Sequence, residues 1–456
     1  MKTEFTAEQL ADPATAVSSQ AIRKCVHCGF CTATCPTYVL DGDERDSPRG
    51  RIYLIKDMLE RDAAPTADVV RHIDRCLSCL ACTTTCPSGV DYRHLVDHAR
   101  AYVEARYRRP LPERVFRTLL AWLLPHRGRF SWALRLGALA RPFAPLVAGL
   151  DRSGRLATML ELVPRRRSHG ERSPRVRMQA PHPDGPRRGR VLLLQGCAEP
   201  VLLPSIRAAT VRLLERLGYA VEFAAGEGCC GALVHHLGRE HDGLAYVRRN
   251  LDAWRGRLEE GGVDAILATA SGCGSQLKDY GFLLRNDPDY APLAARAAAL
   301  ARDLSELVEG EAVQRLKVGV SARIAYHAAC SLQHGQKIVG RPRALLEAAG
   351  FTVIEPAESH LCCGSAGTYN ILQPRIAARL GRRKAERLAA CQPDAIATGN
   401  VGCAVQIGRF SGAPVLHVAE LLDWATGGPP PDALHSAMGD GAVATTAPAS
   451  VGGGHA

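Results

Sequence analysis

Short apolar runs alternate with longer amphipathic segments from Val191 onward. Residues 190–197 (RVLLLQGC) and 220–225 (AVEFAA) have the pattern of strands, and the segment between them, 203–218, has the periodicity of a helix. A third apolar run, 264–273 (DAILATASGC), reads as a strand that ends in a turn. Strands that alternate with helices in this way are typical of α/β layers with parallel strands. The pattern therefore predicts a layered α/β region in the second half of the chain.

This α/β region consists of two copies of one unit. Four landmarks of the first copy return 133 residues later, so that Cys197, Cys229, Cys230 and Gly231 correspond to Cys330, Cys362, Cys363 and Gly364. A fifth landmark, Cys273, corresponds to Cys403 at a displacement of 130, and the flanking segments DAILATASGC and DAIATGNVGC also agree. Because five coincident landmarks are hard to obtain by chance, we infer a duplicated domain.

Two dense cysteine motifs of the same spacing lie nearer the N-terminus, KCVHCGFCTATCP at 24–36 and RCLSCLACTTTCP at 75–87. In proteins with two [4Fe-4S] clusters, three thiolates of such a motif bind one cluster and the fourth, before a proline, binds the other. The spacing therefore predicts one cluster on Cys25, Cys28, Cys31 and Cys86, and a second on Cys76, Cys79, Cys82 and Cys35. Zinc sites are the alternative, although zinc usually uses two separated C-x2-C pairs.

Each copy of the α/β unit supplies four more thiols, and loops at strand ends gather on one side of a parallel sheet. Both sets are candidate ligands of a metal ion or a cluster: Cys197, Cys229, Cys230, Cys273, Cys330, Cys362, Cys363 and Cys403. The alternative is reduced thiols, or a structural zinc, in a packing fold. His327 and His334 flank Cys330 and His360 precedes the second pair; we interpret all three as hydrogen-bonded loop histidines rather than ligands. Cys391, outside the repeat, is interpreted as a buried apolar thiol.

Composition and charge limit the class of protein, the cellular compartment and the kinds of partner that are compatible with the sequence. The chain has 456 residues, 46% hydrophobic and 23% charged, which is ordinary for a globular protein of two or three domains. Its first residues lack the features of a signal peptide, and no apolar run reaches the length of a spanning helix. We therefore expect a cytoplasmic protein whose 17 cysteines stay reduced, and metal ligation explains them better than disulfides do. The net charge of +11 falls largely in a basic stretch at 165–190, which favours an acidic partner or a membrane surface over nucleic acid.

These patterns predict a mixed fold class, α+β and α/β, in five regions. A helical ferredoxin-like domain with two clusters (15–105) precedes a helical segment with a basic linker (106–189), two cysteine-rich repeats (190–318 and 319–425) and a disordered tail (426–456). Residues 111–150 mix apolar and cationic side chains, which suits a peripheral position on an anionic membrane. The alternative is packing on the α/β half or on a partner subunit. The side chains concerned are Phe116, Trp122, Phe130, Trp132, Arg114, Arg117, Arg129, Arg135 and Arg141.

The sequence contains no G-x-G-x-x-G motif after a strand and no P-loop. We therefore expect no flavin or nicotinamide site on this chain, and we assign a catalytic role to none of its residues. Iron–sulfur clusters exchange single electrons, so any two-electron oxidation is expected on another centre.

Tandem ferredoxin motifs followed by two CCG repeats resemble the cysteine-rich-domain family. Segments 46–60 (DSPRGRIYLIKDMLE), 72–92 (HIDRCLSCLACTTTCPSGVDY) and 399–409 (GNVGCAVQIGR) are similar to those of glycolate oxidase iron–sulfur subunits, and the resemblance spans roughly residues 15–425. It implies an electron-transfer subunit of a glycolate dehydrogenase, with an FAD-containing partner that forms glyoxylate and with quinone or another acceptor downstream. It also fits a peripheral position on the inner face of the cell membrane. The alternatives are the iron–sulfur subunit of a lactate or glycerol-3-phosphate dehydrogenase, or a catalytic subunit like heterodisulfide reductase.

The sequence departs from the fuller motif of that family in one respect. The family's repeat ends in C-x-x-C, but the first position of this pair is Ala270 in one copy and Asn400 in the other. Each copy thus keeps four cysteines of a full set of five, which argues against a disulfide-reducing cluster. We expect the second repeat to be the more active one, because it alone carries His327 and His334 around its first cysteine.

Overall fold

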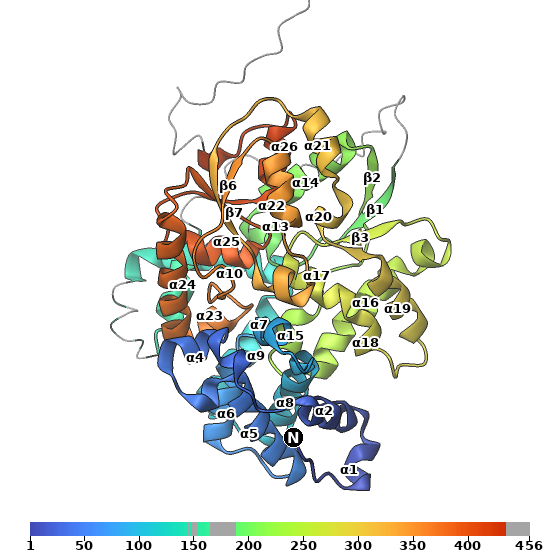
Figure 1. Cartoon of the computed structure of the whole chain (residues 1–456), viewed down its shortest axis with the longest axis vertical. Coiled ribbons are helices and arrows are strands. Elements are labelled where there is room, and N and C mark those ends of the chain that lie inside the picture. Colours follow the sequence, from blue (N-terminus) through green and yellow to red (C-terminus); the bar gives the residue numbers. More distant parts are fainter. Residues whose placement is uncertain (145, 147–148, 150, 152, 165–187, 435–456) are drawn as a thin grey trace, which may run out of the picture.

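The computed structural model describes residues 1–144, 146, 149, 151, 153–164 and 188–434 (Figure 1). Most of the basic linker expected at 165–190, and most of the tail expected at 426–456, lie outside these residues. The described part forms a helical N-terminal domain (blue), a helical segment after it, and two parallel sheets with their helices (green to red). This arrangement confirms the predicted fold class, while the five boundaries stay predictions.

The N-terminal domain is built from short helices that alternate with the cysteine motifs. They are α1 (Ala7–Ala11), α2 (Pro13–Lys24), α3 (Phe30–Ala33), α4 (Pro36–Asp41), the 3-10 turn η1 (Glu44–Asp46), α5 (Pro48–Glu60), α6 (Ala67–Asp74), α7 (Ala81–Thr85) and α8 (Tyr92–Arg106). Helix α5 begins with proline at its first position, and its cap Ser47 accepts a hydrogen bond from the Gly50 N–H at 3.0 Å. The helices surround a core that includes Ile22, Ile55 and Leu95, all fully buried.

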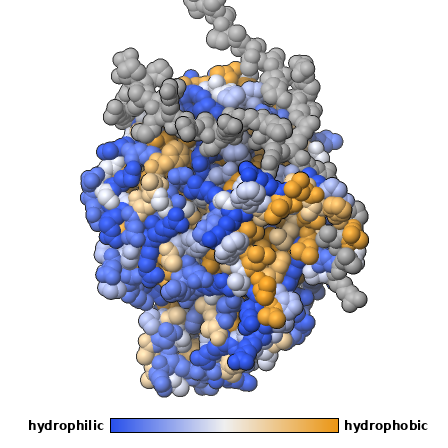
Figure 2. All heavy atoms as spheres, turned by 180° about the vertical axis from the view of Figure 1, so that it is seen from behind, coloured by the Kyte–Doolittle hydropathy of each residue, from blue (hydrophilic) through white to orange (hydrophobic). Residues whose placement is uncertain are grey.

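The segment expected to seek a surface, 111–150, contains α9 (Leu111–Leu123), α10 (Arg127–Ala140) and the 3-10 turn η2 (Arg141–Phe143), and α12 (Arg155–Glu161) follows it. Several of its large apolar side chains are exposed, for example Trp132 at 63% and Leu139 at 74%, whereas Leu120 is buried. Figure 2 shows apolar surface (orange) gathered on this face of the molecule. Arg117 differs from the expectation, because it is buried and donates to the Leu237 carbonyl at 3.1 Å instead of joining the exposed cations. Within the described ranges, no helix meets the length and apolarity that crossing a membrane requires.

Both repeats form a four-stranded parallel sheet with the same strand order, β2–β1–β3–β4 and β6–β5–β7–β8, which confirms the duplication. The first sheet contains β1 (Gly189–Leu193), β2 (Tyr219–Glu222), β3 (Ala265–Leu267) and β4 (Ala301–Arg302). The second contains β5 (Arg323–His327), β6 (Thr352–Ile354), β7 (Ala395–Thr398) and β8 (Val415–His417). The three apolar runs singled out in the sequence correspond to β1, β2 and β3.

Helices connect the parallel strands, as such sheets require. Those of the first repeat are α13 (Glu199–Leu202), α14 (Pro204–Arg216), α15 (Ala232–His235), α16 (Glu240–Glu259), α17 (Ser271–Lys278), α18 (Tyr280–Leu283), α19 (Ala291–Leu300), α20 (Leu304–Leu307) and α21 (Gly310–Leu316). Those of the second are the π-helical turn η3 (Ser331–Gly335), α22 (Arg341–Ala348), α23 (Tyr369–Leu372), α24 (Pro374–Ala389), α25 (Val401–Gly408) and α26 (Val418–Ala425).

The two repeats share part of their hydrophobic core. Helix α14 of the first repeat packs against α26 of the second, and α21 packs against α22. Leu213 of α14 and Leu422 of α26 are fully buried in the same apolar cluster. Across this contact the buried Asp423 carboxylate accepts hydrogen bonds from Arg212 at 2.6 Å and Arg216 at 3.0 Å. The copies are therefore joined by both apolar and ionic contacts.

Candidate functional site

The first predicted thiol set surrounds one small cavity. Cys25 follows α2, Cys31 lies on α3 and Cys86 follows α7, so the second motif sends its last cysteine back to the first. These three thiols and Cys28 all line the cavity, and Cys28 is exposed at its rim. Gly29 turns the chain between them with φ +86°, a backbone conformation that favours glycine. The structure thus brings together the four cysteines predicted to bind the first cluster, with Cys82 of the second predicted set also at this cavity, and their ligation of one cluster stays a prediction.

The second predicted set lies deeper in the protein. The pKa of Cys79 is raised well above its ordinary value, first by burial and then by negative charge on Cys330, Cys35 and Cys76. Burial and the neighbouring thiols, including Cys79, Cys76 and Cys35, raise the pKa of Cys82 in the same way. Thiolates this close together in a buried place need positive charge beside them. The donor set therefore fits a cluster whose iron supplies that charge.

A buried arginine that our sequence analysis missed lies beside the second set. Arg51 on α5 is 1% exposed, and its Nη1 lies 3.8 Å from the Cys35 sulfur. Its Nε donates to the His72 carbonyl at 2.7 Å, and its Nη2 donates to Thr37 Oγ1 at 3.0 Å. Burial disfavours the charge, but the negative charge of Cys76 and of the other nearby acidic groups raises the pKa of Arg51 and keeps it cationic. In the sequence, the only indication of a role for Arg51 was its position in the segment DSPRGR, one of those that resemble the family.

The charge of Arg51 is balanced by a buried carboxylate. Asp46 is fully buried, and its Oδ1 lies 3.3 Å from Arg51 Nη2 and 2.7 Å from His72 Nδ1. Its Oδ2 accepts a hydrogen bond from Arg75 Nη1 at 2.7 Å. Arg75 directly precedes Cys76, so this network connects α5 to the backbone of the second motif.

The N-terminal domain docks on the second repeat next to these thiols. Leu77 from the second motif and Cys362 from the CCG loop belong to one buried apolar cluster, and Cys79 and Cys330 pack against it. The Cys330 and Cys362 sulfur atoms are 3.7 Å apart. Cys79 of the second predicted set therefore lies close to Cys330 and Cys362 of the second repeat.

A cavity of about 570 Å³ connects the thiols of the two repeats. Apolar side chains of α10 and α12, such as Phe130, Leu134 and Met159, form part of its wall. A volume of this order is typical of sites that accept a small molecule. All eight candidate cysteines line it: Cys197, Cys229, Cys230, Cys273, Cys330, Cys362, Cys363 and Cys403.

The residues that replace the fifth cysteine have structural partners of their own. The Asn400 Oδ1 caps α25 by accepting from the Gly402 N–H at 2.8 Å, and its Nδ2 donates to Ser271 Oγ at 2.9 Å. Ser271, which follows Ala270, also lies 2.7 Å from Ser331 Oγ. These hydrogen bonds hold the strand-end loops of the two repeats against each other where the family's fuller motif has a thiol.

Two interpretations of single residues were wrong. His327 is the last residue of β5, and neither ring nitrogen has a hydrogen-bond partner although the side chain is 1% exposed. Burial, and then the nearby Lys384 cation, lower the pKa of His327 well below its ordinary value, so the ring is neutral. Cys391 is half-buried rather than buried. His334 does form the expected hydrogen bond, at 2.8 Å to Thr84 Oγ1 in the second ferredoxin motif.

Comparisons with known proteins agree with this geometry. The family model of the 4Fe-4S dicluster domain matches residues 24–90, and the model of the cysteine-rich domain matches residues 191–278 and 324–408. The chain is 42% identical over 425 residues to the glycolate oxidase iron–sulfur subunit of Escherichia coli (strain K12), which covers 93% of this chain and 99% of that protein. It belongs to the family of glycolate oxidase iron–sulfur subunits. As a member of this family, with its dicluster domain, it is an iron–sulfur protein.

Two further relatives show how far the likeness extends. The probable glycolate oxidase iron–sulfur subunit of Bacillus subtilis (strain 168) is 33% identical over 426 residues, covering 88% of this chain and 94% of that protein. Lactate utilization protein A of Geobacillus thermodenitrificans (strain NG80-2) is 28% identical over 243 residues, covering 51% of this chain and 98% of that protein. The full-length likeness is thus to the glycolate oxidase subunits, and the lactate utilization protein matches only half of the chain.

Crossed ligation predicts which cluster a single substitution damages. In Cys35→Ser, we expect loss of the cluster bound by Cys76, Cys79 and Cys82. The cluster bound by Cys25, Cys28 and Cys31, which are nearer to Cys35 in the sequence, should remain. EPR spectra of the reduced variant, assigned with Cys28→Ser, measure this. Cys391→Ser serves as the control, because that thiol lies outside every set. Loss of the Cys25, Cys28 and Cys31 cluster from Cys35→Ser would refute the assignment.

Arg51 is expected to act on both stability and redox potential. Arg51→Met leaves Asp46 buried with one cation fewer, which should lower the free energy of unfolding by about 3 kcal/mol. It also removes positive charge near the Cys35 sulfur, so the midpoint potential of the second cluster should fall, because reduction adds negative charge. Redox titration followed by EPR measures the shift, and Arg51→Lys should give a smaller one. An unchanged potential in Arg51→Met would show that the guanidinium does not tune the cluster.

Proposed function

We propose that this chain is the electron-transfer subunit of a complex that oxidises glycolate to glyoxylate. A separate flavoprotein subunit would take the hydride from the 2-hydroxy acid, and the electrons would pass singly through this chain toward a quinone or another acceptor. The observation that carries the proposal is the likeness to a glycolate oxidase iron–sulfur subunit over 99% of that protein's length. This chain combines the two thiol sets of a dicluster domain with a duplicated cysteine-rich domain.

The first thiol set lies near exposed side chains and the second set is enclosed. This difference supports electron flow from the first set to the second. Near the first thiol set, Val26 is 67% and Phe30 62% exposed beside the exposed Cys28, which suits docking of an electron-donating partner. The second set is enclosed and adjoins Cys330 and Cys362 of the second repeat. One cluster would be bound by Cys25, Cys28, Cys31 and Cys86, and the other by Cys76, Cys79, Cys82 and Cys35. When bound, these clusters would exchange single electrons.

The thiols of both repeats are included in this proposal as ligands of a further metal or cluster. All eight line one cavity. Hydrogen bonds with neighbouring thiols shift the pKa of each thiol, and together with burial they leave the pKa of all eight above its ordinary value, so the thiolate form needs a bound cation. A heterodisulfide-reductase-like activity is disfavoured, because Asn400 serves as a helix cap where such a motif has a cysteine.

We further propose that α9 and α10 bring the complex to an anionic membrane surface. Their exposed apolar side chains lie beside arginines, and the Arg129 and Arg135 guanidinium groups stack 4.3 Å and 5.2 Å from the ring centres of Trp122 and Trp132. Aromatic rings beside cations are typical of segments that bind at the headgroup level. A peripheral position there would place the acceptor end of the complex near membrane quinone.

The division of labour between subunits is open to a direct test. The chain purified alone, free of flavin, should not reduce a dye with glycolate; recombined with the flavoprotein that co-purifies from its host, it should become reduced when glycolate is added. Phe30→Glu should slow that reduction several-fold, because it places a charge at the proposed contact. Val339→Glu, which changes an apolar side chain that is 75% exposed in the second repeat, is the control.

Two results would refute the proposal. Glycolate-dependent dye reduction by the flavin-free chain would place substrate oxidation on this subunit. Reduction of the recombined complex by lactate or glycerol 3-phosphate, but not by glycolate, would assign it to another dehydrogenase.

Membrane attachment is expected to depend on lipid charge and on α10. The protein should float with liposomes that contain anionic lipid, and less so with neutral liposomes or at high salt, because each basic group near the surface contributes about 1 kcal/mol. Leu136→Asp with Leu139→Asp should abolish flotation, and Val339→Asp should not. Flotation that ignores lipid charge and salt would instead favour a face that packs on a partner subunit.

A further inference from the structure

Helix α10 carries apolar residues on two sides, whereas a helix at a protein surface normally has one apolar face. One set, spaced three or four residues apart, lines the cavity of about 570 Å³: Phe130, Ala133, Leu134, Gly137 and Ala140. The other set is exposed: Trp132, Leu136 and Leu139. It lies on the apolar face seen in Figure 2. The helix therefore lies between an apolar cavity and an apolar surface.

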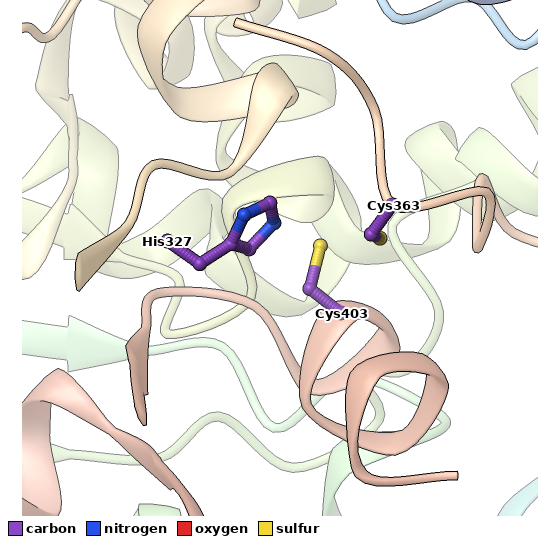
Figure 3. Close-up of side chains that lie close together, drawn as sticks. All are labelled: His327, Cys363 and Cys403. Atoms are coloured by element: carbon purple, nitrogen blue, oxygen red, sulfur yellow. The ribbon is translucent and has the colours of Figure 1, made fainter. Parts of the chain in front are cut away.

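The cavity has an apolar part and a part lined by thiols. Helix α12 extends the apolar part with Leu156, Met159 and Leu160. The thiols come from the two repeats, and Figure 3 shows two of them, Cys363 and Cys403, beside the His327 ring, which does not line the cavity. A ligand on the apolar part needs none of these thiols.

The cavity also reaches the second ferredoxin motif. Cys76, Leu77 and Ser78 line it, and Cys76 belongs to the second predicted set of cluster ligands. The Arg100 guanidinium fixes this part of the wall, because it donates to the Cys76 carbonyl and to Ser78 Oγ, each at 2.6 Å. A small molecule in the cavity would therefore lie next to the protein that surrounds the second thiol set.

One buried donor in the cavity wall is unsatisfied. Arg117 of α9 lines the cavity and is 5% exposed, yet its Nε has no hydrogen-bond partner among the described residues. Because a buried donor without a partner costs free energy, an acceptor oxygen of a ligand would be stabilised here. Asp74 Oδ1 lies 3.8 Å from Arg117 Nη1 and offsets its charge, so the ligand needs no charge of its own.

A second polar group, His236, lines the cavity from the first repeat. Its Nδ1 lies 3.1 Å from Asp97 Oδ1, so Nε2 is the ring nitrogen left for a ligand. Burial raises the pKa of Asp97, but His236, His235 and Arg100 outweigh burial and hold that pKa well below its usual range. The ionised carboxylate therefore fixes the orientation of the His236 ring.

We propose that this cavity binds a lipophilic quinone, whose carbonyl oxygens hydrogen-bond to Arg117 and His236 and whose tail lies against α10 and α12. The site would be the acceptor end of the proposed electron relay, and it rests on that proposed function. A quinone is neutral and apolar except for its carbonyl oxygens, which matches an apolar wall with a few polar groups.

Reduction at this site would add two electrons and two protons to the quinone, which would leave as the quinol. The relay would deliver the electrons singly, and the solvent that reaches the half-buried His236 side chain would supply the protons. The exposed side of α10 is the surface proposed to lie on the membrane, where lipophilic quinones dissolve. Entry beside this helix would bring the ligand from lipid to the cavity without passing through water.

Binding of decylubiquinone to the full-length chain with its clusters tests the site, by equilibrium dialysis without glycolate or flavoprotein. Ala133→Trp fills the cavity side of α10, so it should weaken binding at least about tenfold. Ala138→Trp is the matched control, because it makes the same change at an exposed position of the same helix that does not line the cavity. It should leave the dissociation constant unchanged.

The hydrogen bonds have a separate readout. The infrared carbonyl band of bound decylubiquinone should lie at lower frequency than in a solvent without donors, because a hydrogen bond weakens the C=O bond. His236→Phe should move part of this band back and weaken binding several-fold, and His236→Gln, which keeps a donor, should do so less. His241→Phe, which changes a histidine that is 94% exposed in the same repeat, should change neither.

Four results would overturn the proposal. Wild-type protein without saturable binding of decylubiquinone has no such site, and equal affinities of Ala133→Trp and Ala138→Trp would place binding elsewhere. A wild-type carbonyl band at the unbonded frequency would exclude the hydrogen bonds even if the variants fail to fold. Palmitate that displaces decylubiquinone with an affinity unchanged by His236→Phe would assign the cavity to a lipid chain.

Failure of this site can be told apart from failure of the proposed function. Reduction of the chain by the flavoprotein and glycolate, without binding of decylubiquinone, would refute the quinone site alone. Binding of decylubiquinone that persists when the recombined complex does not oxidise glycolate would refute the glycolate assignment alone.

Discussion

Thiolates cannot stand side by side in a protein interior unless positive charge is held among them, and much of this structure follows from that constraint. Burial and the charge of neighbouring thiols raise the pKa of Cys79 and Cys82, and contacts with neighbouring thiols together with burial leave the pKa of Cys230 and Cys363 in the repeats raised as well. The protein provides some of the charge itself, through Arg51 beside the second set and Lys384 near the thiols of the second repeat. The remainder must come from bound metal, so folding and metal binding are thermodynamically linked.

The parts of the site that the sequence predicted are those in which spacing alone determines geometry. Cysteines at fixed intervals before a proline predicted that Cys86 would return to the first motif, and the cavity it shares with Cys25 agrees. The repeat in the cysteines predicted two similar sheets, and both have the same strand order. In each case the information is local or periodic, so no knowledge of the tertiary packing was needed.

The residues that the sequence did not reveal are those whose roles depend on packing. Arg51 looks like an ordinary arginine of an amphipathic helix, and only the fold places Asp46 and the Cys35 sulfur against it. Arg117 has the spacing of an exposed cation, but the first repeat covers it. His327 was interpreted as a hydrogen-bonded loop histidine, but it is the buried last residue of β5, and neither of its ring nitrogens has a hydrogen-bond partner there.

The contact between α14 and α26 has a consequence for how the protein unfolds. Each repeat completes its core with helices of the other copy, so a single repeat would expose the leucines of that contact and leave Asp423 without its two arginines. Although the copies descend from one unit, we therefore expect them to unfold together as one cooperative block. We expect mutations at this contact to lower the stability of both copies, whereas residues at the strand ends can differ in chemistry, as Leu194 after β1 and His327 at the end of β5 do.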